Sequence, residues 1–247
     1  MRQRLTPAGR SERRRFCSHL PGMTHTAEVF VERLAALRPA GSAPDDFDRV
    51  RMGEIFKLAK ECADMEPDEI ERLLASPIHA VRVGAVSVMD WQARSRRTPP
   101  GRRRELFELY LRRHDRIDTW DLVDRSAIYV VGEYLADKPR DVLYELAGSA
   151  RPMERRTAIL STYAFMRRGQ VDDTFAIAKL LVDDPDDTVH KAVGWMLREA
   201  GKRDPDRLIA FVEPRAALMP RVMLRYAIEK FDKPERDRFL GMKSAPS

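Results

Sequence analysis

Hydrophobic residues recur at three- and four-residue intervals along most of the chain, the period that gathers them on one face of an α-helix. This pattern predicts amphipathic helices at about residues 28–37, 47–62, 78–95, 103–114, 119–136, 153–167, 171–182, 188–201 and 218–231. No stretch shows sustained alternation of polar and apolar residues between hairpin turns, so β-strands are not expected. Prolines beside capping or loop residues predict helix starts at Ser76-Pro77, Pro99-Pro100-Gly101, Asp184-Pro185 and Asp204-Pro205.

A weak internal repeat organises these helices. Alanines occur at intervals of 42, 31, 34 and 35 residues, and each lies one to three residues after a basic side chain. The alanines are Ala85, Ala127, Ala158, Ala192 and Ala227, and the basic residues are Arg82, Arg125, Arg156, Lys191 and Arg225. Small residues let paired helices approach closely, so this period predicts an all-α superhelical solenoid of HEAT-like helix pairs with a concave groove. The basic residues could follow a phosphate backbone along that groove, whereas each one taken alone is better explained by a surface ion pair.

The charge of +6 is concentrated at the start of the 247-residue chain. Residues 1–22 contain six arginines and one glutamate, a balance of +5, which leaves about +1 for the remaining residues. We expect residues 1–22 to be a disordered basic extension: a nucleic-acid tail, a transit peptide, or the product of a misassigned start before Met23. Residues 23–247 are expected to form a single HEAT-like repeat domain, in which any polyanion site must be a local basic patch.

Several classes of protein are excluded by what the sequence lacks. No apolar run approaches the roughly 20 residues that a membrane-spanning helix needs. Cys17 and Cys62 follow no metal-binding spacing, and the histidines show no ligand spacing, so we expect no metal, no cofactor and no disulfide framework. The first residues lack the apolar core of a secretory signal, which favours a cytoplasmic protein. Nothing in the sequence indicates oligomerisation, and a monomer is expected.

Trp120 and Asp124 are the strongest candidates for a functional site. They are four residues apart in a predicted helix, so an aromatic plane and a carboxylate project from one face. Such a pair can hold a flat or sugar-like group and stabilise positive charge beside it. Trp195 has a similar helical context. On local grounds alone, a core tryptophan and a solvated or ion-paired aspartate explain the spacing better.

A dense basic run precedes these residues. It comprises Gly101-Arg-Arg-Arg104 and Leu111-Arg-Arg-His-Asp-Arg116. Contact with DNA and a solvated helix face explain this run equally well.

Three motifs resemble those of the DNA alkylation repair family, the AlkD-like HEAT-repeat DNA glycosylases. They are Trp120-Asp-Leu-Val-Asp124, Glu154-Arg-Arg156-Thr-Ala-Ile-Leu160 and Lys191-Ala-Val-Gly-Trp-Met-Leu-Arg-Glu199. Ser76-Pro-Ile-His-Ala-Val-Arg82 and Leu224-Arg-Tyr-Ala-Ile-Glu229 add support, and the similarity covers about residues 24–241. The resemblance implies a solenoid whose concave face binds duplex DNA and removes purines alkylated at N3 or N7.

The resemblance also implies roles for particular residues. Asp124 takes the place of the catalytic carboxylate, and Trp120 and Trp195 take the places of the aromatic residues that flank the damaged nucleotide. Arg156 and Arg198 match basic residues near the DNA backbone. Two departures from the family pattern are Met153, where an aromatic residue is common, and Ala80, where a glutamate commonly follows the histidine and could form a buried ion pair.

Three hypotheses follow. The preferred one is a glycosylase for cationic alkylpurines in duplex DNA, acting through Asp124, with Arg156, Arg198, Lys191, Arg82 and Arg125 as candidate DNA-binding residues. The second is a non-catalytic HEAT-like protein that binds damaged or distorted DNA. The third is a protein-interaction scaffold, which the nearly neutral charge of residues 23–247 favours.

Overall fold

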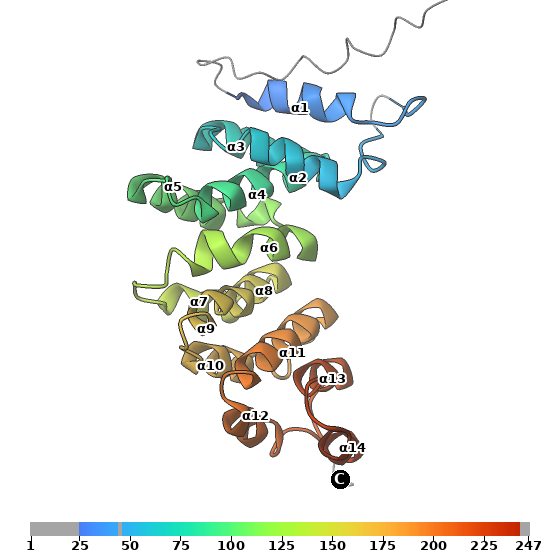
Figure 1. Ribbon diagram of the computed structural model, residues 1–247, viewed down its shortest axis with the longest axis vertical. Coiled ribbons are helices and arrows are strands. Elements are labelled where there is room, and N and C mark those ends of the chain that lie inside the picture. Colours follow the sequence, from blue (N-terminus) through green and yellow to red (C-terminus); the bar gives the residue numbers. More distant parts are fainter. Residues whose placement is uncertain (1–24, 44–45, 243–247) are drawn as a thin grey trace, which may run out of the picture.

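The computed structural model describes residues 25–43 and 46–242, and every regular element in these ranges is helical (Figure 1). The all-α fold expected from the hydrophobic period is therefore confirmed. In chain order the elements are α1 (Ala27–Ala36), α2 (Met52–Glu61), α3 (Pro67–Ala75), α4 (His79–Arg94), α5 (Pro100–Arg112), the 3-10 turn η2 (His114–Arg116), α6 (Trp120–Ala127), the π-helical segment η3 (Ile128–Gly132), α7 (Asp141–Ala147), α8 (Pro152–Ser161), α9 (Tyr163–Met166), α10 (Asp172–Leu180), α11 (Asp187–Gly201), α12 (Pro205–Val212), α13 (Arg221–Ala227) and α14 (Lys233–Gly241).

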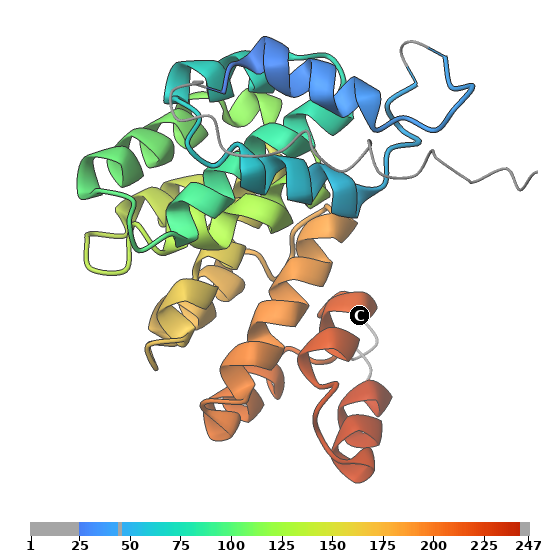
Figure 2. The same ribbon diagram turned by 45° about the horizontal axis from the view of Figure 1, so that its top comes forward.

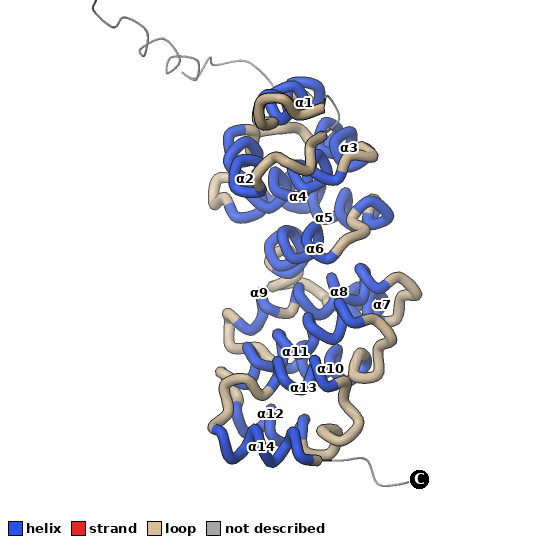
Figure 3. Tube along the Cα trace, turned by 90° about the vertical axis from the view of Figure 1, so that its right-hand side faces the viewer, coloured by secondary structure: helices blue, strands red, loops and turns tan. Residues whose placement is uncertain are grey.

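The helices are stacked in two rows to form a solenoid. In the first row, α2, α4, α6, α8, α11 and α13 each contact the next member. In the second row, α3, α5, α7, α10 and α12 pack against the first, while α1 covers α2 and α3. Figure 1 shows the stack growing from the blue helix α1 to the red helix α14, and Figure 3 shows it from the side. In Figure 2 the orange helix α11 lies between the yellow helices and the red C-terminal helices.

Small residues lie where the first-row helices meet. Each of the five alanines of the sequence repeat is buried, and each lies on a different first-row helix: Ala85, Ala127, Ala158, Ala192 and Ala227. Gly194 of α11 shows how close the contact is. A Cβ atom on this residue would lie 2.6 Å from the carbonyl oxygen of Met223 and 2.6 Å from the Cβ of Tyr226, both on α13. The repeat therefore reports the helix register of the first row.

Local sequence explains several helix ends. Helix α5 begins at Pro100, and α12 begins at Pro205 with the Asp204 side chain accepting a hydrogen bond from the backbone N–H of Arg207, as predicted. Helix α11 begins at Asp187, one residue before the predicted range 188–201 and two residues after the start expected at Pro185. The carboxylate of Asp186 accepts from two backbone N–H groups at this end. Proline at position 185 thus belongs to the loop.

Short helices escaped the sequence pattern. Helices α3, α7 and α14 were not predicted, and α12 was predicted only through its start at Asp204-Pro205. These four helices contain between seven and nine residues each. Helix α7 buries only Leu143 and Ala147, and α14 buries only Phe239. Two or fewer apolar anchors do not define a period of 3.6, because that period becomes visible only over several turns.

The N-terminal extension expected at residues 1–22, including Cys17, lies outside the described residues. Cys62 is buried, and burial raises the pKa of its thiol to about 11. Among the described helices, none combines the length and the apolar character that crossing a bilayer requires.

Candidate functional site

Trp120 and Asp124 lie one helical turn apart on α6, in the first row. Trp120 is 56% exposed, which is unusual for a large aromatic residue. The Asp124 side chain retains 25% of its accessible surface. The sequence left open whether this tryptophan belongs to the core, and the structure places it on the surface.

Asp124 forms a bidentate ion pair with Arg156 of α8. The Nε of Arg156 donates to Oδ1 and its Nη2 donates to Oδ2, both at 2.8 Å. The third guanidinium nitrogen, Nη1, donates to the backbone carbonyl of Thr188 in α11. The Arg156 side chain is only 6% exposed. Through these bonds it connects three neighbouring first-row helices, α6, α8 and α11. Each oxygen of Asp124 keeps a lone pair for another donor, because a carboxylate accepts about four hydrogen bonds.

Helix α11 contributes a second part of the same surface. Thr188, Lys191, Trp195 and Arg198 follow one another at intervals of three and four residues, so they share one helical face. Trp195 is half-buried and packs against the hydrophobic core with one part of its ring. Lys191 is exposed, and no carboxylate of the described residues pairs with its ammonium group. Since Thr188 bonds to Arg156, this face begins at the Asp124 ion pair.

A buried polar cluster is formed by the residue that follows Arg156. Thr157, the next residue along α8, bonds through its hydroxyl to Tyr110 at 3.2 Å and to the Nε2 of His114 at 2.9 Å. Burial raises the pKa of Tyr110 to about 12 and lowers the pKa of His114. Both rings are therefore held neutral at physiological pH. Sequence reasoning assigned His114 to a basic surface run, because nothing local shows that it faces Thr157.

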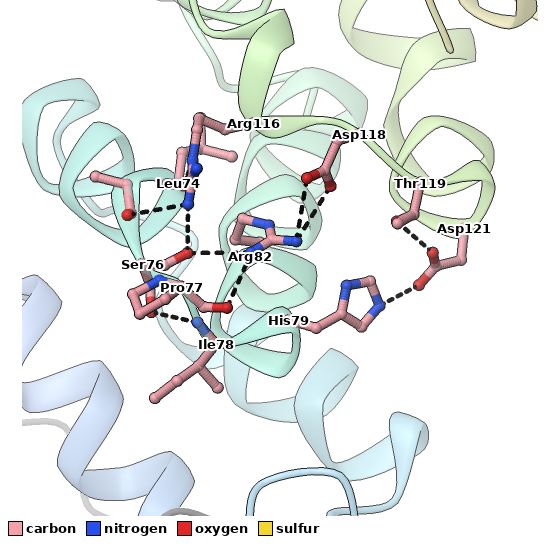
Figure 4. A network of polar contacts seen from close by, with 11 residues as sticks. Leu74, Ser76, Pro77, Ile78, His79, Arg82, Arg116, Asp118, Thr119 and Asp121 are labelled. Carbon is pink, nitrogen blue, oxygen red and sulfur yellow. Dashed lines mark hydrogen bonds and ion pairs between the residues drawn. The ribbon is translucent and has the colours of Figure 1, made fainter. Parts of the chain in front are cut away.

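Arg82 lies in a separate network between α4 and the loop before α6, shown in Figure 4. Its Nη1 donates to the carbonyls of Ser76 and Pro77, and its Nη2 donates to Asp118 at 3.1 Å. Arg116 adds a further bond to the Ser76 carbonyl. Arg82 is buried, so its guanidinium connects loops inside the stack and does not lie beside Asp124.

His79 carries a contact that the sequence did not predict. Its Nε2 lies 2.8 Å from Oδ2 of Asp121, and Oδ1 of Asp121 accepts from the Thr119 hydroxyl at 2.7 Å (Figure 4). The absence of a glutamate at Ala80 raised the question of a missing ion pair. In this structure His79 instead connects α4 to the first turn of α6, one residue after Trp120.

Arg125, next to Asp124, is directed toward α4 and α2. It lies 3.2 Å from the carboxylate of Asp90 and donates to the hydroxyl of Ser87 at 3.2 Å. Its guanidinium also stacks on Phe56, 4.3 Å from the ring centroid. Asp90 is completely buried, and desolvation raises its pKa above the usual range although Arg125 and Arg94 oppose the shift.

The remaining basic candidates are ion-paired. Arg198 contacts Glu199 and, in the next repeat, Glu229. In the basic run before α6, Arg104 pairs with Glu108, while Arg112 and Arg113 share Glu71. These pairs agree with the solvated-face explanation for most of the run.

The described residues contain no cluster of three histidine, cysteine, aspartate or glutamate side chains that could hold a metal ion. The sequence pattern of the family described as DNA alkylation repair enzyme matches residues 32–231, which is most of the chain and includes every residue of the site. No individual curated protein matches the chain.

Proposed function

Because the chain belongs to the DNA alkylation repair enzyme family, we propose that it is a DNA glycosylase that excises cationic N3- or N7-alkylated purines from duplex DNA. Asp124 is the proposed catalytic carboxylate. Trp120 and Trp195 are proposed to contact the damaged nucleotide. Lys191 and Arg198 are proposed to contact the phosphate backbone.

The observation that carries the proposal is the state of Asp124. Both of its oxygens are fixed by Arg156, yet a quarter of its side chain remains open to solvent next to an exposed indole. A carboxylate that is oriented before the substrate arrives costs no reorganisation when positive charge develops beside it. An aspartate serving packing alone gains nothing from an exposed tryptophan one turn earlier.

The chemistry needs only this one carboxylate. Alkylation at N7 or N3 places positive charge on the purine. When the C1′–N bond breaks, its electron pair goes to the purine, which leaves as a neutral base. The sugar then carries oxocarbenium-like charge, which Asp124 stabilises electrostatically. Water adds to C1′ and releases one proton to Asp124 or to solvent. No general acid is required, which is why a second carboxylate is unnecessary.

The tryptophans support the same charge. An indole face attracts a cation through its ring quadrupole, by roughly 0.5–2 kcal/mol for each contact. Trp120 offers an uncovered surface for a cationic base or an electron-poor sugar. Trp195 is more constrained by packing, so it suits a positioning role.

Arg156 is proposed to act through Asp124, as a positioning residue, because its guanidinium nitrogens are directed to Asp124 and Thr188. Arg82 and Arg125 are left out of the proposed DNA contacts, since their guanidinium groups are directed to Asp118 and Asp90. Arg198 is kept, although it is ion-paired, because it shares the face of α11 that carries Lys191 and Trp195. Lys191 is exposed on this surface, and its ammonium group pairs with no carboxylate of the described residues. The protein is proposed to act as a monomer on cellular DNA in the cytoplasm.

One observation favours a second candidate function. The Asp124–Arg156 pair also joins α6 to α8, as a purely structural ion pair would. A non-catalytic protein that binds damaged duplexes needs no more than this pair and exposed Lys191. A protein-interaction scaffold would need neither DNA affinity nor base release.

The test is release of free bases from duplex DNA carrying known lesions. We expect the wild-type protein to release 7-methylguanine and 3-methyladenine, which are cationic in DNA, and to leave uncharged O6-methylguanine in place. Duplex binding without release of any base would support the non-catalytic alternative. Absence of binding at low salt would leave only the scaffold.

A further inference from the structure

A large basic cavity lies at the opposite end of the helix that carries Asp124. It has a volume of about 940 Å³ and is formed where four segments meet. These are the C-terminal end of α4, the first turn of α5, the segment from η3 to Lys138, and the residues that follow α9. The cavity is connected to the Asp124 site by one continuous helix, formed by α6 and η3.

The lining of this cavity is strongly cationic. Six arginines and one lysine face two acids, Glu133 and Asp137. The arginines are Arg94, Arg96, Arg103, Arg104, Arg167 and Arg168. The chain after residue 22 has a net charge of only about +1, so an excess of about +5 in one cavity is a local concentration. Such a cavity attracts a polyanion, because like charges lining a low-dielectric recess focus the potential.

The donors in the cavity are only partly used. Arg96 is exposed, and no acid of the described residues pairs with it. Arg94 uses Nε for Asp90 and leaves its two terminal nitrogens without a hydrogen bond to any described residue. Helix α5 also begins here, at Pro100, without a side-chain cap, so its first free backbone N–H groups add partial positive charge at the rim.

The aromatic residues of the cavity indicate which part of a nucleic acid it accepts. The ring of Tyr134 stacks on Phe107 with centroids 4.3 Å apart, and the Arg94 guanidinium lies 3.9 Å from the centroid of Tyr129. Lys138 lies over Tyr134 as well, 4.6 Å from its centroid. Aromatic faces that are already covered cannot stack on a base. The cavity therefore offers charge for phosphates and no platform for nucleobases.

The distance from Asp124 fits a duplex. Glu133, at the cavity, is nine residues after Asp124 along α6 and η3, and because the π-helical segment rises less per residue than an α-helix, the separation is on the order of 10 Å. The major groove of B-form DNA is about 12 Å wide between the two backbones, a gap of the same order. One duplex can thus place a strand at Asp124 and the other strand at the cavity.

We infer that this cavity binds the phosphodiester backbone of the undamaged strand while the damaged strand lies at Trp120 and Asp124. The inference rests on the proposed function for the choice of duplex, and the contact itself is independent of base sequence. This contact would give the duplex a second phosphate-binding site, on the other side of the first row from Lys191.

The test is the salt dependence of duplex binding by a double variant, Arg96→Ala with Arg104→Ala. Both side chains are exposed, and Glu108, the ion-pair partner of Arg104, is exposed too. The double variant should therefore fold as the wild type does. We expect the duplex Kd at low salt to rise roughly tenfold and the slope of log K against log salt to fall by about 2 in magnitude. Unmodified duplex DNA is the probe, so base release is not needed for this readout.

The matched control is Arg207→Ala with Lys179→Ala, in the second-row helices α12 and α10. Arg207 pairs with exposed Asp172, as Arg104 pairs with Glu108, and Lys179 is exposed, as Arg96 is. Arg207 also lies over the Phe175 ring, 4.8 Å from its centroid, so its removal costs at least as much stability as the removal of Arg104. The control should keep the wild-type Kd and slope. Equal losses in both double variants would overturn the inference, because they would report only the change of net charge.

Three further outcomes test the inference, and the first and last of them separate it from the proposed function. If wild type releases bases and the cavity variant binds duplex as tightly as wild type, the cavity inference fails while the glycosylase stands. If inorganic tripolyphosphate binds the cavity and the variant abolishes that binding without changing duplex affinity, the cavity serves a small polyanion and the inference is again overturned. Loss of duplex affinity in the variant without any base release by wild type supports the cavity and contradicts the enzyme.

Discussion

Arg156 binds both oxygens of Asp124, with its Nε and Nη2 each 2.8 Å from one of them. The sequence resemblance predicts that Arg156 lies near the DNA backbone, and the structure shows that it is also the partner of the carboxylate. The pair joins α6 to α8, and the bond from Arg156 to the Thr188 carbonyl extends the connection to α11. The orientation of the proposed catalytic group is therefore set by the packing of three helices.

Replacing Trp120 by alanine should separate function from stability. Because the indole is mostly exposed, we expect the free energy of unfolding to change by no more than about 0.5 kcal/mol. Release of 7-methylguanine should fall by roughly two- to thirtyfold, the change in rate that corresponds to the loss of about 0.5–2 kcal/mol of aromatic contact with the cation. Urea unfolding and a base-release assay on the same preparation provide both values.

Trp91→Ala is the matched control for Trp120. Trp91 is half-buried, its Nε1 donates to the Phe56 carbonyl at 3.3 Å, and Lys60 lies 5.1 Å from its ring centroid. This variant should lose about 3 kcal/mol of stability and keep base release at temperatures where it is folded. A Trp120 variant that released bases at the wild-type rate would remove this residue from the site.

The sequence predicted this surface because helical spacing decides which residues share a face. Trp120 and Asp124, four residues apart, do lie on one turn, and the alanine repeat marked the first row correctly. The partner of Asp124 was not predictable in this way. It lies 32 residues away on another helix, and the adjacent Arg155 pairs instead with Asp184. Two neighbouring arginines with different partners look the same in a sequence.

Gly194 tests how closely α11 and α13 must approach. A methyl group at this position would lie 2.6 Å from backbone and side-chain atoms of α13, so Gly194→Ala forces the helices apart. We expect a loss of about 1–3 kcal/mol in the free energy of unfolding. In contrast, Gly53→Ala in α2 meets no atom within 4 Å and should stabilise the protein by about 0.5–1 kcal/mol, because alanine favours a helix. Equal effects at the two positions would contradict the close packing of the first row.

His114 gives the protein a defined dependence on pH. Burial lowers the pKa of His114 in the folded state, so the unfolded chain binds a proton first as the pH falls below about 6.5. The contribution of neutral His114 to the free energy of unfolding is therefore fully present above pH 6.5. Below that pH it decreases by up to about 1.4 kcal/mol per pH unit. Urea unfolding at pH 7.5 and pH 5.5 should show a larger loss for wild type than for His114→Gln. The same loss in both proteins would assign the dependence to other groups.

The most direct test of the account is base release from methylated duplex DNA by Asp124→Asn. Asparagine keeps the size of the side chain and removes its charge, so duplex binding should persist while release of 7-methylguanine falls by at least about 100-fold. Since this change also breaks an ion pair, two other aspartates that pair with arginines serve as controls. Asp118→Asn affects a more exposed carboxylate, with 47% of its side chain accessible, and Asp184→Asn affects a buried one, with 2% accessible.

Both controls should release bases at rates near wild type under conditions where they are folded. The predicted result is loss of base release in Asp124→Asn alone. The exposure of Asp124 lies between those of Asp118 and Asp184, so the loss of stability in Asp124→Asn should lie between those of the two controls. Of the three aspartates, Asp124 is the one that lies one helical turn after Trp120. Release by Asp124→Asn at the wild-type rate would contradict it, and the Asp124–Arg156 pair would then be a structural contact between α6 and α8.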